Sequence, residues 1–332
     1  MFKITFHPPN NSSFSPVKTS QRLFSEMFLY LGIMSLIEDF NLQPYKRPQF
    51  ESYVKSPFNY IGGKYRLLSQ IVPLFPKDID TFVDLFCGGC NVAFNVSANN
   101  TVCNDINAKI IEIFQYLLSH PIKETLQHIY DRINEYQLSK TNEYGFNKFR
   151  EYYNQNPHPL DLYVLICYSY NYQFRFNNNL QYNSSFGRDR SEFTPNMKRN
   201  LTEFVSRASH LNVRFTSFEF QNIDLSYLTP RDFIYLDPPY LITTGNYNDG
   251  NRGFKNWTEE QEKLLLELLT ELSSRGVRFA LSNVLYHKGR TNDILLQWSK
   301  DYNIYDIKSS YSSSSFNTKG ESREVVIINY GL

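Results

Sequence analysis

An acid, two prolines and a tyrosine stand side by side at Asp237-Pro238-Pro239-Tyr240, and they form the group in this chain best suited to chemistry. The apolar run at 233–236 precedes them and predicts a buried strand whose C-terminal end carries Asp237. Open α/β sheets bind their ligands at that end. Proline lacks an N–H donor and holds the residue before it extended. We therefore expect a rigid ledge of oxygen acceptors beside an aromatic ring, which suits an amino group on a flat ring.

A second strand-like run, at 81–85, contains Asp84 and leads into a loop with a glycine pair and then a helix-like stretch from Asn91. The loop reads Phe86-Cys87-Gly88-Gly89. A strand, a turn of bare backbone and a helix together predict a nucleotide-binding loop. The G-x-G-x-x-G spacing of dinucleotide-binding proteins is missing, which argues against NAD or FAD as the ligand.

Asp105 follows a predicted strand at 101–104 and lies 21 residues beyond Asp84. An acid about 20 residues past the first turn is placed to bind ribose hydroxyls. The alternative is that Asp105 caps a helix that begins near Ala108, a common role for aspartate. The two roles are compatible.

A glycine pair and a lysine, Gly62-Gly63-Lys64, stand directly before a helical pattern that begins at Tyr65. The glycines let the backbone approach a ligand closely, and the lysine can reach it. A Walker phosphate loop requires G-x-x-x-x-G-K-[ST], whose first glycine and final hydroxyl are missing here, so ATP is disfavoured.

Taken in order, these segments resemble the Dam-type N6-adenine DNA methyltransferases, and the resemblance covers about residues 57–330. Two further segments, 171–188 and 323–330, match the family's recognition loop and its closing strand. The resemblance implies an α/β fold, a doubly wound methyltransferase (Rossmann-like) sheet with an inserted, mainly helical target-recognition lobe. It implies a site-specific, adenine-specific DNA methyltransferase that transfers a methyl group from S-adenosylmethionine to the N6 amine of a flipped adenine in a short duplex site.

The implied partners are double-stranded DNA and, in a restriction-modification system, a cognate endonuclease that acts separately. N4-cytosine methylation is one alternative, because that amine is activated in the same way. A DNA-binding protein without catalysis is the other. Gln173, Ser184 and Ser185 depart from the family's residues in the region that reads DNA, so GATC is only one candidate site.

The resemblance also assigns roles to residues. The catalytic residues are Asp237, Pro238 and Tyr240, of which Tyr240 would stack on the flipped base. The methyl donor would be bound by Tyr60, Gly62, Gly63, Lys64, Asp84, Phe86, Cys87, Gly88, Gly89, Asp105 and Asp237. DNA would be bound by Arg175, which is the best candidate for reading a guanine, and by Asn177, Asn183, Arg188 and Lys198.

Three regions follow from this assignment. Residues 51–120 and 215–332 form the S-adenosylmethionine-binding catalytic domain, and residues 121–214 form the DNA target-recognition lobe. Residues 1–50 form an N-terminal arm that is rich in Pro, Asn and Ser at its start and carries an accessory helix within 22–40. An alternative is that translation begins at Met27 or Met34.

The composition sets limits on partners and location. The net charge of the 332-residue chain is only +1, but residues 170–215 carry seven Arg and Lys against three acids, a net of +4, where we expect phosphate contacts. The apolar stretch at 28–34 is too short to cross a membrane. Four cysteines in a chain of this length predict no disulfide scaffold, which favours a cytoplasmic location. Because no second C-x-x-C pair accompanies Cys87 and Cys90, the sequence also predicts no metal site.

The remaining elements follow from hydrophobic periodicity. Helices are expected at 65–74, 108–118, 122–136, 160–170 and 258–274, the last opened by Thr258. Strands are expected at 82–85, 101–104, 233–236, 279–282, 303–309 and 324–330. Strands that alternate with helices predict a parallel sheet, and the late pair predicts an antiparallel strand at one side of it.

Overall fold

The computed structural model describes residues 52–60, 62–243, 257–308 and 322–332, which belong to one compact unit. The predicted N-terminal arm and its accessory helix lie outside the described residues.

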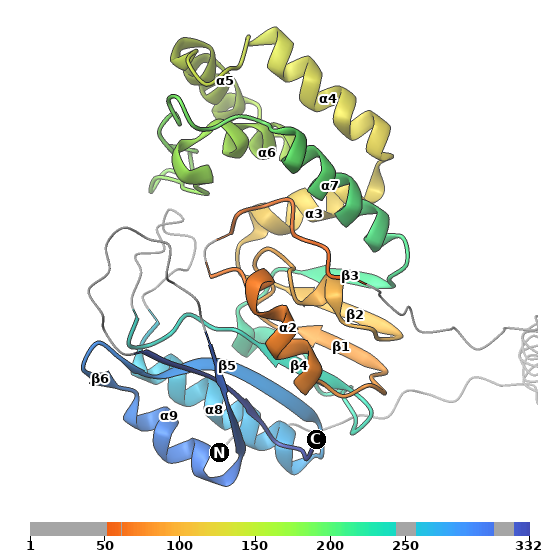
Figure 1. Ribbon diagram of the computed structural model, residues 1–332, viewed down its shortest axis with the longest axis vertical. Helices are drawn as coiled ribbons and strands as arrows, with labels where there is room; N and C mark the ends of the chain where they lie inside the picture. The colour runs from red at the N-terminus through yellow and green to blue at the C-terminus, as the bar shows by residue number, and fades with distance from the viewer. Residues whose placement is uncertain (1–51, 61, 244–256, 309–321) are drawn as a thin grey trace, which may run out of the picture. The chain divides into compact units, whose positions relative to one another are not determined.

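A mixed sheet forms the centre of this unit (Figure 1). Its described strands are β1 (Thr81–Asp84), β2 (Asn100–Asn104), β3 (Val213–Thr216), β4 (Phe233–Leu236), β5 (Arg278–His287), β6 (Arg290–Thr291), β7 (Asn303–Ile307) and β8 (Ser322–Ile328). They lie in the order β3-β2-β1-β4-β5-β8-β7, with β6 paired to β5. The first five strands of this order run parallel, and β8 runs antiparallel to both its neighbours. The predicted α/β class, the parallel sheet and its late antiparallel strand are confirmed.

The two faces of the sheet are covered by different helices. Alternate strand residues point to opposite faces, so Phe82 and Tyr235 pack in one core while Val83 and Ile234 pack in the other. The first core is closed by α2 (Leu68–Ile71) and α3 (Ala108–Ser119). The second is closed by α8 (Glu259–Ser274) and α9 (Asp293–Trp298). Short 3₁₀ turns flank α2 at Tyr65–Leu67 and Val72–Leu74 and follow α9 at Ser299–Asp301.

The segment between β2 and β3 adds a helical layer beyond α3 (Figure 1). It consists of α4 (Ile122–Glu135), α5 (Glu143–Gln155), α6 (Pro159–Tyr168) and α7 (Pro195–Ala208). Every residue of α6 after Pro159 is buried, because α3, α4 and α5 surround this helix. Its side chains share the first core with the sheet. The insertion is therefore mainly helical, as predicted.

Two local predictions are wrong. The helix expected from Asn91 is only a 3₁₀ turn at Ala93–Asn95. The Asn91 and Asn95 carboxamides instead accept backbone N–H groups of Ser56 at 3.0 Å and Val54 at 2.8 Å, which ties this stretch to the preceding loop. Asparagine side chains compete with helical hydrogen bonds in this way. The second error is the strand at 279–282, which continues to His287 because β8 pairs with it across a bulge between Val284 and Tyr286.

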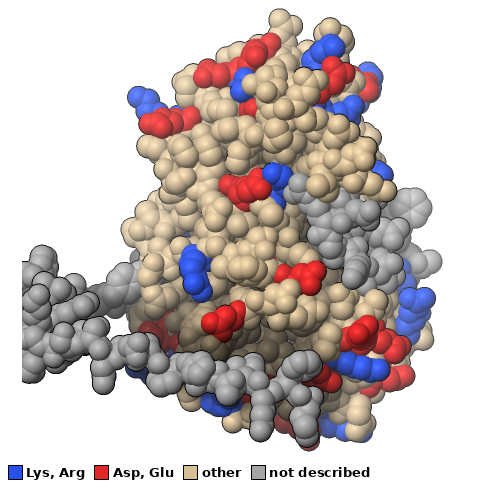
Figure 2. Space-filling view, turned by 180° about the vertical axis from the view of Figure 1, so that it is seen from behind, with Lys and Arg blue, Asp and Glu red and all other residues tan. Residues whose placement is uncertain are grey.

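Charged side chains of both signs are interspersed on the face drawn in Figure 2, and basic residues do not dominate it. This distribution fits the net charge of +1. No helix of the described residues is long and apolar enough to span a membrane.

Candidate active site

A cavity of about 410 Å³ opens at the C-terminal ends of β1, β2 and β4. All the residues that the sequence assigns to catalysis or to the methyl donor line it, although they come from four separate segments of the chain. The strands explain this convergence, since β2, β1 and β4 are parallel neighbours and end at one edge. The fold thus brings the predicted catalytic and donor-binding residues together around one cavity, while the role of each residue stays a prediction.

Asp237 is the centre of a polar group in this cavity, in which Lys64 is buried while Asp237 and Tyr240 are half-buried. Its Oδ2 lies 2.7 Å from the Lys64 Nζ, and its Oδ1 accepts a hydrogen bond of 2.9 Å from the Tyr240 hydroxyl. Lys64 is only 7% exposed and also donates to the Gly62 carbonyl at 3.1 Å. Its ammonium lies 5.2 Å from the centre of the Tyr240 ring. These contacts fix the carboxylate on the ledge that the prolines predict.

Glu324 joins this group and was missed by the sequence analysis. Its Oε1 lies 3.4 Å from the Tyr240 hydroxyl and 4.0 Å from the Lys64 Nζ. Burial, Asp237 and Glu324 raise the pKa of Tyr240 well above its usual value, so its phenol stays neutral. The available signal was an acid at the start of the apolar run Val325–Ile328, because a charge on a buried strand requires a partner.

Asp84 is buried at the end of β1. Its Oδ2 accepts the N–H of Ala93 at 3.2 Å, whereas no described residue hydrogen-bonds Oδ1. Burial, Cys103 and Asp237 raise its pKa well above the usual value. A buried carboxyl with an open position beside a cavity is suited to a polar ligand group.

Asp105 holds the glycine loop in place. Its Oδ2 accepts the N–H of Gly88 at 2.8 Å, and its Oδ1 accepts that of Asn107 at 2.9 Å. Asn107 caps α3 by accepting from Lys109, so the alternative role of Asp105 as the helix cap is wrong. Gly88 has a φ of +45°, and a Cβ there would lie 3.0 Å from the Tyr60 ring, so a larger residue would crowd the loop.

Comparison with known proteins decides the family. Residues 60–313 match the model of the D12 class N6 adenine-specific DNA methyltransferases, a range that contains every cavity residue named above. The chain belongs to this family. This D12-class chain is 57% identical over 280 residues to the type II methyltransferase M.FokI of Planomicrobium okeanokoites. It is 53% identical over 283 residues to the modification methylase StsI of Streptococcus sanguinis.

Each of these two alignments covers 84% of the chain but only 43% of the relative, so the chain spans less than half the length of these relatives. The type II methyltransferase M.MjaIII of Methanocaldococcus jannaschii is 24% identical, and its alignment covers 83% of the chain and 99% of that relative.

Three aromatic rings close one side of the D12-class cavity. Phe86, Phe220 and Trp257 line it, with ring centres 5.6 to 5.8 Å apart. Trp257 donates its indole N–H to Glu262, which is buried and also accepts from Asn283 and Asn292. Only Phe86 was assigned from the sequence. Phe220 and Trp257 lie far from the motifs along the chain, so no spacing rule points to them.

The free cysteines of the glycine loop, Cys87 and Cys90, are buried, as is Cys103 on β2. Burial raises the pKa of both loop thiols well above the usual value, which keeps them protonated and unreactive. Their packing in the first core explains why this loop contains them.

The predicted DNA-reading residues Arg175, Asn177 and Asn183 lie together on a hairpin that follows α6. Phe176 bridges to Tyr182, and the Asn177 carboxamide accepts the N–H groups of Asn179 and Gln181 at 3.0 Å. The Arg175 guanidinium is exposed and makes no ion pair or hydrogen bond with a described residue. Asn177 thus shapes the turn, and Arg175 extends from it.

The structure does not bring the other two predicted DNA contacts into this group. Arg188 forms an ion pair with Glu143 at the start of α5, and Lys198 on α7 lies 5.4 Å from the ring of Tyr130. Arg190, which was not singled out from the sequence, lies 4.9 Å from the ring of the exposed Tyr170.

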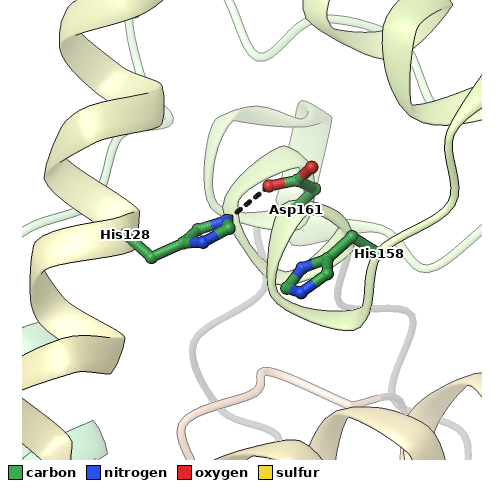
Figure 3. A group of neighbouring side chains, drawn as sticks. All are labelled: His128, His158 and Asp161. Carbon is green, nitrogen blue, oxygen red and sulfur yellow. Dashed lines mark hydrogen bonds and ion pairs between the residues drawn. The ribbon is translucent and has the colours of Figure 1, made fainter.

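His128, His158 and Asp161 form a cluster of metal-ligand types at the joint of α4 and α6 (Figure 3). Asp161 Oδ1 lies 2.6 Å from His128 Nε2 and accepts from Arg132 at 2.9 Å. His158 Nδ1 accepts the N–H of Leu160, which leaves the proton of the neutral ring on Nε2. The two rings are nearly parallel, 4.9 Å apart, so their in-plane lone pairs do not meet at one point. This arrangement fastens α6 to α4 and does not suit an ion.

Proposed function

We propose that this chain methylates the N6 amine of adenine in a short site of duplex DNA, with S-adenosylmethionine as the donor. The observation that carries the proposal is the hydrogen-bonded group of Asp237, Lys64 and Tyr240 in the same cavity as Asp84 and the glycine loop. Family membership supports adenine over cytosine as the base.

The residues of the cavity fit the donor. The open Oδ1 of Asp84 suits a polar group at its methionine end, beside Lys64. Asp105 would face the ribose, and the rings of Phe86, Phe220 and Trp257 would enclose a flat base. When bound, the donor supplies a methyl group on a positively charged sulfonium.

The chain's own residues explain how a weak nucleophile is activated. The adenine amine is a poor nucleophile because its lone pair is delocalised into the ring. Asp237 and the Pro238 carbonyl would accept its two hydrogens and draw the lone pair back onto nitrogen. The ion pair with Lys64 fixes the position of the Asp237 carboxylate before the reaction. Such preorganised electrostatic groups are usually the largest contribution to catalysis. Holding the reactants at near-attack distance contributes about 7–11 kcal/mol.

An adenine inside a duplex cannot reach the cavity, so it must flip out at a cost of a few kcal/mol. Stacking on the Tyr240 ring would offset part of that cost. We assign the helical insertion, residues 121–214, to target recognition, because it carries the exposed Arg175 hairpin. The relatives' names, a type II methyltransferase and a modification methylase, support a restriction-modification role with a separate endonuclease.

The test is methylation of unmodified DNA by the purified chain with S-adenosylmethionine, followed by mass spectrometry of the nucleosides. We expect N6-methyladenine, and mapping of the modified bases gives the site. N4-methylcytosine would contradict the choice of base. DNA binding without a methylated product would favour the non-catalytic alternative.

A further inference from the structure

The β5–β6 hairpin, residues 286–291, stands beyond the edge of the sheet at which the cavity opens. β4 ends at Leu236, directly before Asp237, and its partner on the parallel strand β5 is Leu281. β5 continues from there to His287. Each residue of a strand advances about 3.3 Å. The end of the hairpin therefore projects well past the Asp237 ledge.

Two basic residues occupy the tip of this hairpin. His287 pairs with Arg290 across a two-residue turn, in which Lys288 and Gly289 have φ values of +47° and +81°. Two successive positive φ values are typical of a type I′ turn, a tight connection that fits the twist of the two strands. This turn presents the side chains of Lys288 and Arg290 to solvent.

The charges at the tip are not neutralised by the described part of the chain. Neither Lys288 nor Arg290 makes an ion pair or a hydrogen bond with a described residue. Burial and these two charges lower the pKa of His287 below its usual 6.5, and no carboxylate of the described residues opposes this shift. The local field is positive although the chain carries a net charge of only +1, so the tip attracts anions.

The base of the hairpin is fastened to the wall of the cavity. Asn292, which follows β6, donates its backbone N–H to the Leu285 carbonyl at 3.0 Å. The carboxamides of Asn292 and Asn283 donate to Glu262 at 2.8 and 3.1 Å. Glu262 is fully buried and also accepts the indole N–H of Trp257, which lines the cavity. One buried carboxylate thus fixes the hairpin relative to the cavity.

The order of the strands places the cavity between this hairpin and the helical insertion. The cavity opens at the ends of β1, β2 and β4, the insertion joins β2 to β3, and β5 lies on the other side of β4. In Figure 1 the insertion lies above the sheet and β6 lies at the lower left. Duplex DNA carries one phosphate charge for about every 1.7 Å of its axis. A duplex whose base enters the cavity therefore has phosphates on both sides of it.

We propose that Lys288 and Arg290 bind phosphates of the duplex, on the side of the flipped adenine that faces away from the helical insertion. The inference rests on the proposed function, because it adds a second contact surface for the same DNA. Arginine binds a phosphate through two parallel N–H groups, and lysine binds it as a point charge. Phosphate contacts orient a duplex without reading its sequence, so the hairpin contributes affinity to every sequence alike.

The double variant Lys288→Ala/Arg290→Ala tests this surface. Its binding to a duplex with the mapped site and to a duplex of unrelated sequence is measured over a series of salt concentrations. Each phosphate contact contributes about 0.9 to the slope of log affinity against log salt, so we expect the slope to fall by about two. The advantage of the parent chain over the variant should then shrink roughly tenfold between about 50 and 200 mM salt. The ratio of the two affinities, site over unrelated sequence, should not change.

Arg231→Ala/Lys300→Ala is the matched control. It removes the same charge from the opposite edge of the sheet, where β4 and β7 begin, and both side chains are exposed. The salt dependence of this variant should equal that of the parent chain, since only a direct contact releases counterions from the DNA. Circular dichroism verifies the fold of both double variants.

The outcomes separate this inference from the proposed function. A parent chain that binds and methylates the duplex, together with a hairpin variant whose salt slope equals that of the control, would overturn the phosphate contact and leave the proposed function standing. A loss confined to the duplex with the site would identify a base contact and would also overturn it. A parent chain that neither binds nor methylates duplex DNA would contradict both.

Discussion

Lys64 and Asp237 form an ion pair inside the cavity, and this pair organises the candidate active site. A buried ion pair contributes little net stability, but removal of one partner leaves the other charge unpaired and costs about 3–5 kcal/mol. The hydroxyl of Tyr240 belongs to the same group. Sequence reasoning assigned the ring of Tyr240 to stacking on the base, and the structure adds that its hydroxyl donates to Asp237 Oδ1.

Asp237→Ala should abolish methyl transfer, because it removes the acceptor for the amine. It should also lower the free energy of unfolding, since Lys64 keeps its buried charge without its main partner. The rate should be measured at saturating donor and DNA on protein whose folding is verified by circular dichroism. Transfer at more than a few per cent of the parental rate would show that Asp237 does not activate the amine.

At the scale of single elements, the Arg175 hairpin and the joint of α4 and α6 differ in what their polar side chains contact. The hairpin is shaped by the Asn177 side chain and presents the exposed Arg175, so it is suited to reading a base. The joint buries the Asp161 carboxylate between Arg132 and two histidines. We propose the first element for recognition, and the second holds α4 and α6 together.

Arg175→Ala should relax discrimination at one base pair, at a cost of about 1–3 kcal/mol there. Lys198→Ala, which removes an exposed charge on α7, should weaken all DNA sequences alike and reduce the salt dependence. Binding to a panel of single-base variants of the site distinguishes the two effects. A uniform loss for Arg175→Ala would identify a phosphate contact instead.

The α4–α6 joint should lose stability in acid. Burial lowers the pKa of His158 below its usual 6.5. Burial alone would raise the pKa of Asp161, but hydrogen bonds from His128 and Arg132 lower it below 3.8. In both cases the unfolded chain binds more protons, so the free energy of unfolding should fall below about pH 6.5 and again below about pH 3.8.

Urea unfolding at several pH values measures this effect. His158→Asn keeps a residue type that caps helices, and it should reduce the first loss of stability. An unchanged pH dependence in this variant would rule out His158 as its source.

At the scale of the whole molecule, the sheet and the helical layer share one core. The buried side chains of α6 pack in the same cluster as Phe82 and Tyr235 of the sheet. The regions proposed for recognition and for catalysis therefore bury each other's apolar side chains. The aligned relatives M.FokI and StsI are more than twice as long as the aligned part of this chain, so the described unit corresponds to less than half of them.

Residues 47–332 should therefore unfold in a single cooperative transition. Circular dichroism in the far ultraviolet, which reports largely on helices, and tryptophan fluorescence from Trp257 and Trp298 beside the sheet should give the same midpoint. An earlier helical transition would show that residues 121–214 fold as a separate domain.

The sequence by itself determined the strands that carry the motifs, and the residues that it assigned to catalysis and to the donor all line the cavity. Local chemistry suffices for this, since an apolar run followed by Asp237 and two prolines, or by glycines, has few other conformations. Periodicity likewise placed α3, α4 and α8 to within two residues. It failed after Gly89, where Asn91 and Asn95 hydrogen-bond to a loop that is distant in sequence.

Only the tertiary structure decided which side chains meet. Glu324 lies 84 positions from Tyr240 along the chain, yet the insertion of β8 beside β5 brings them together. Trp257 and Phe220 also reach the cavity from segments that are distant along the chain. Asp105 holds the glycine loop and does not cap α3. Such contacts depend on strand order and packing, which join distant segments, and no local pattern of residues encodes them.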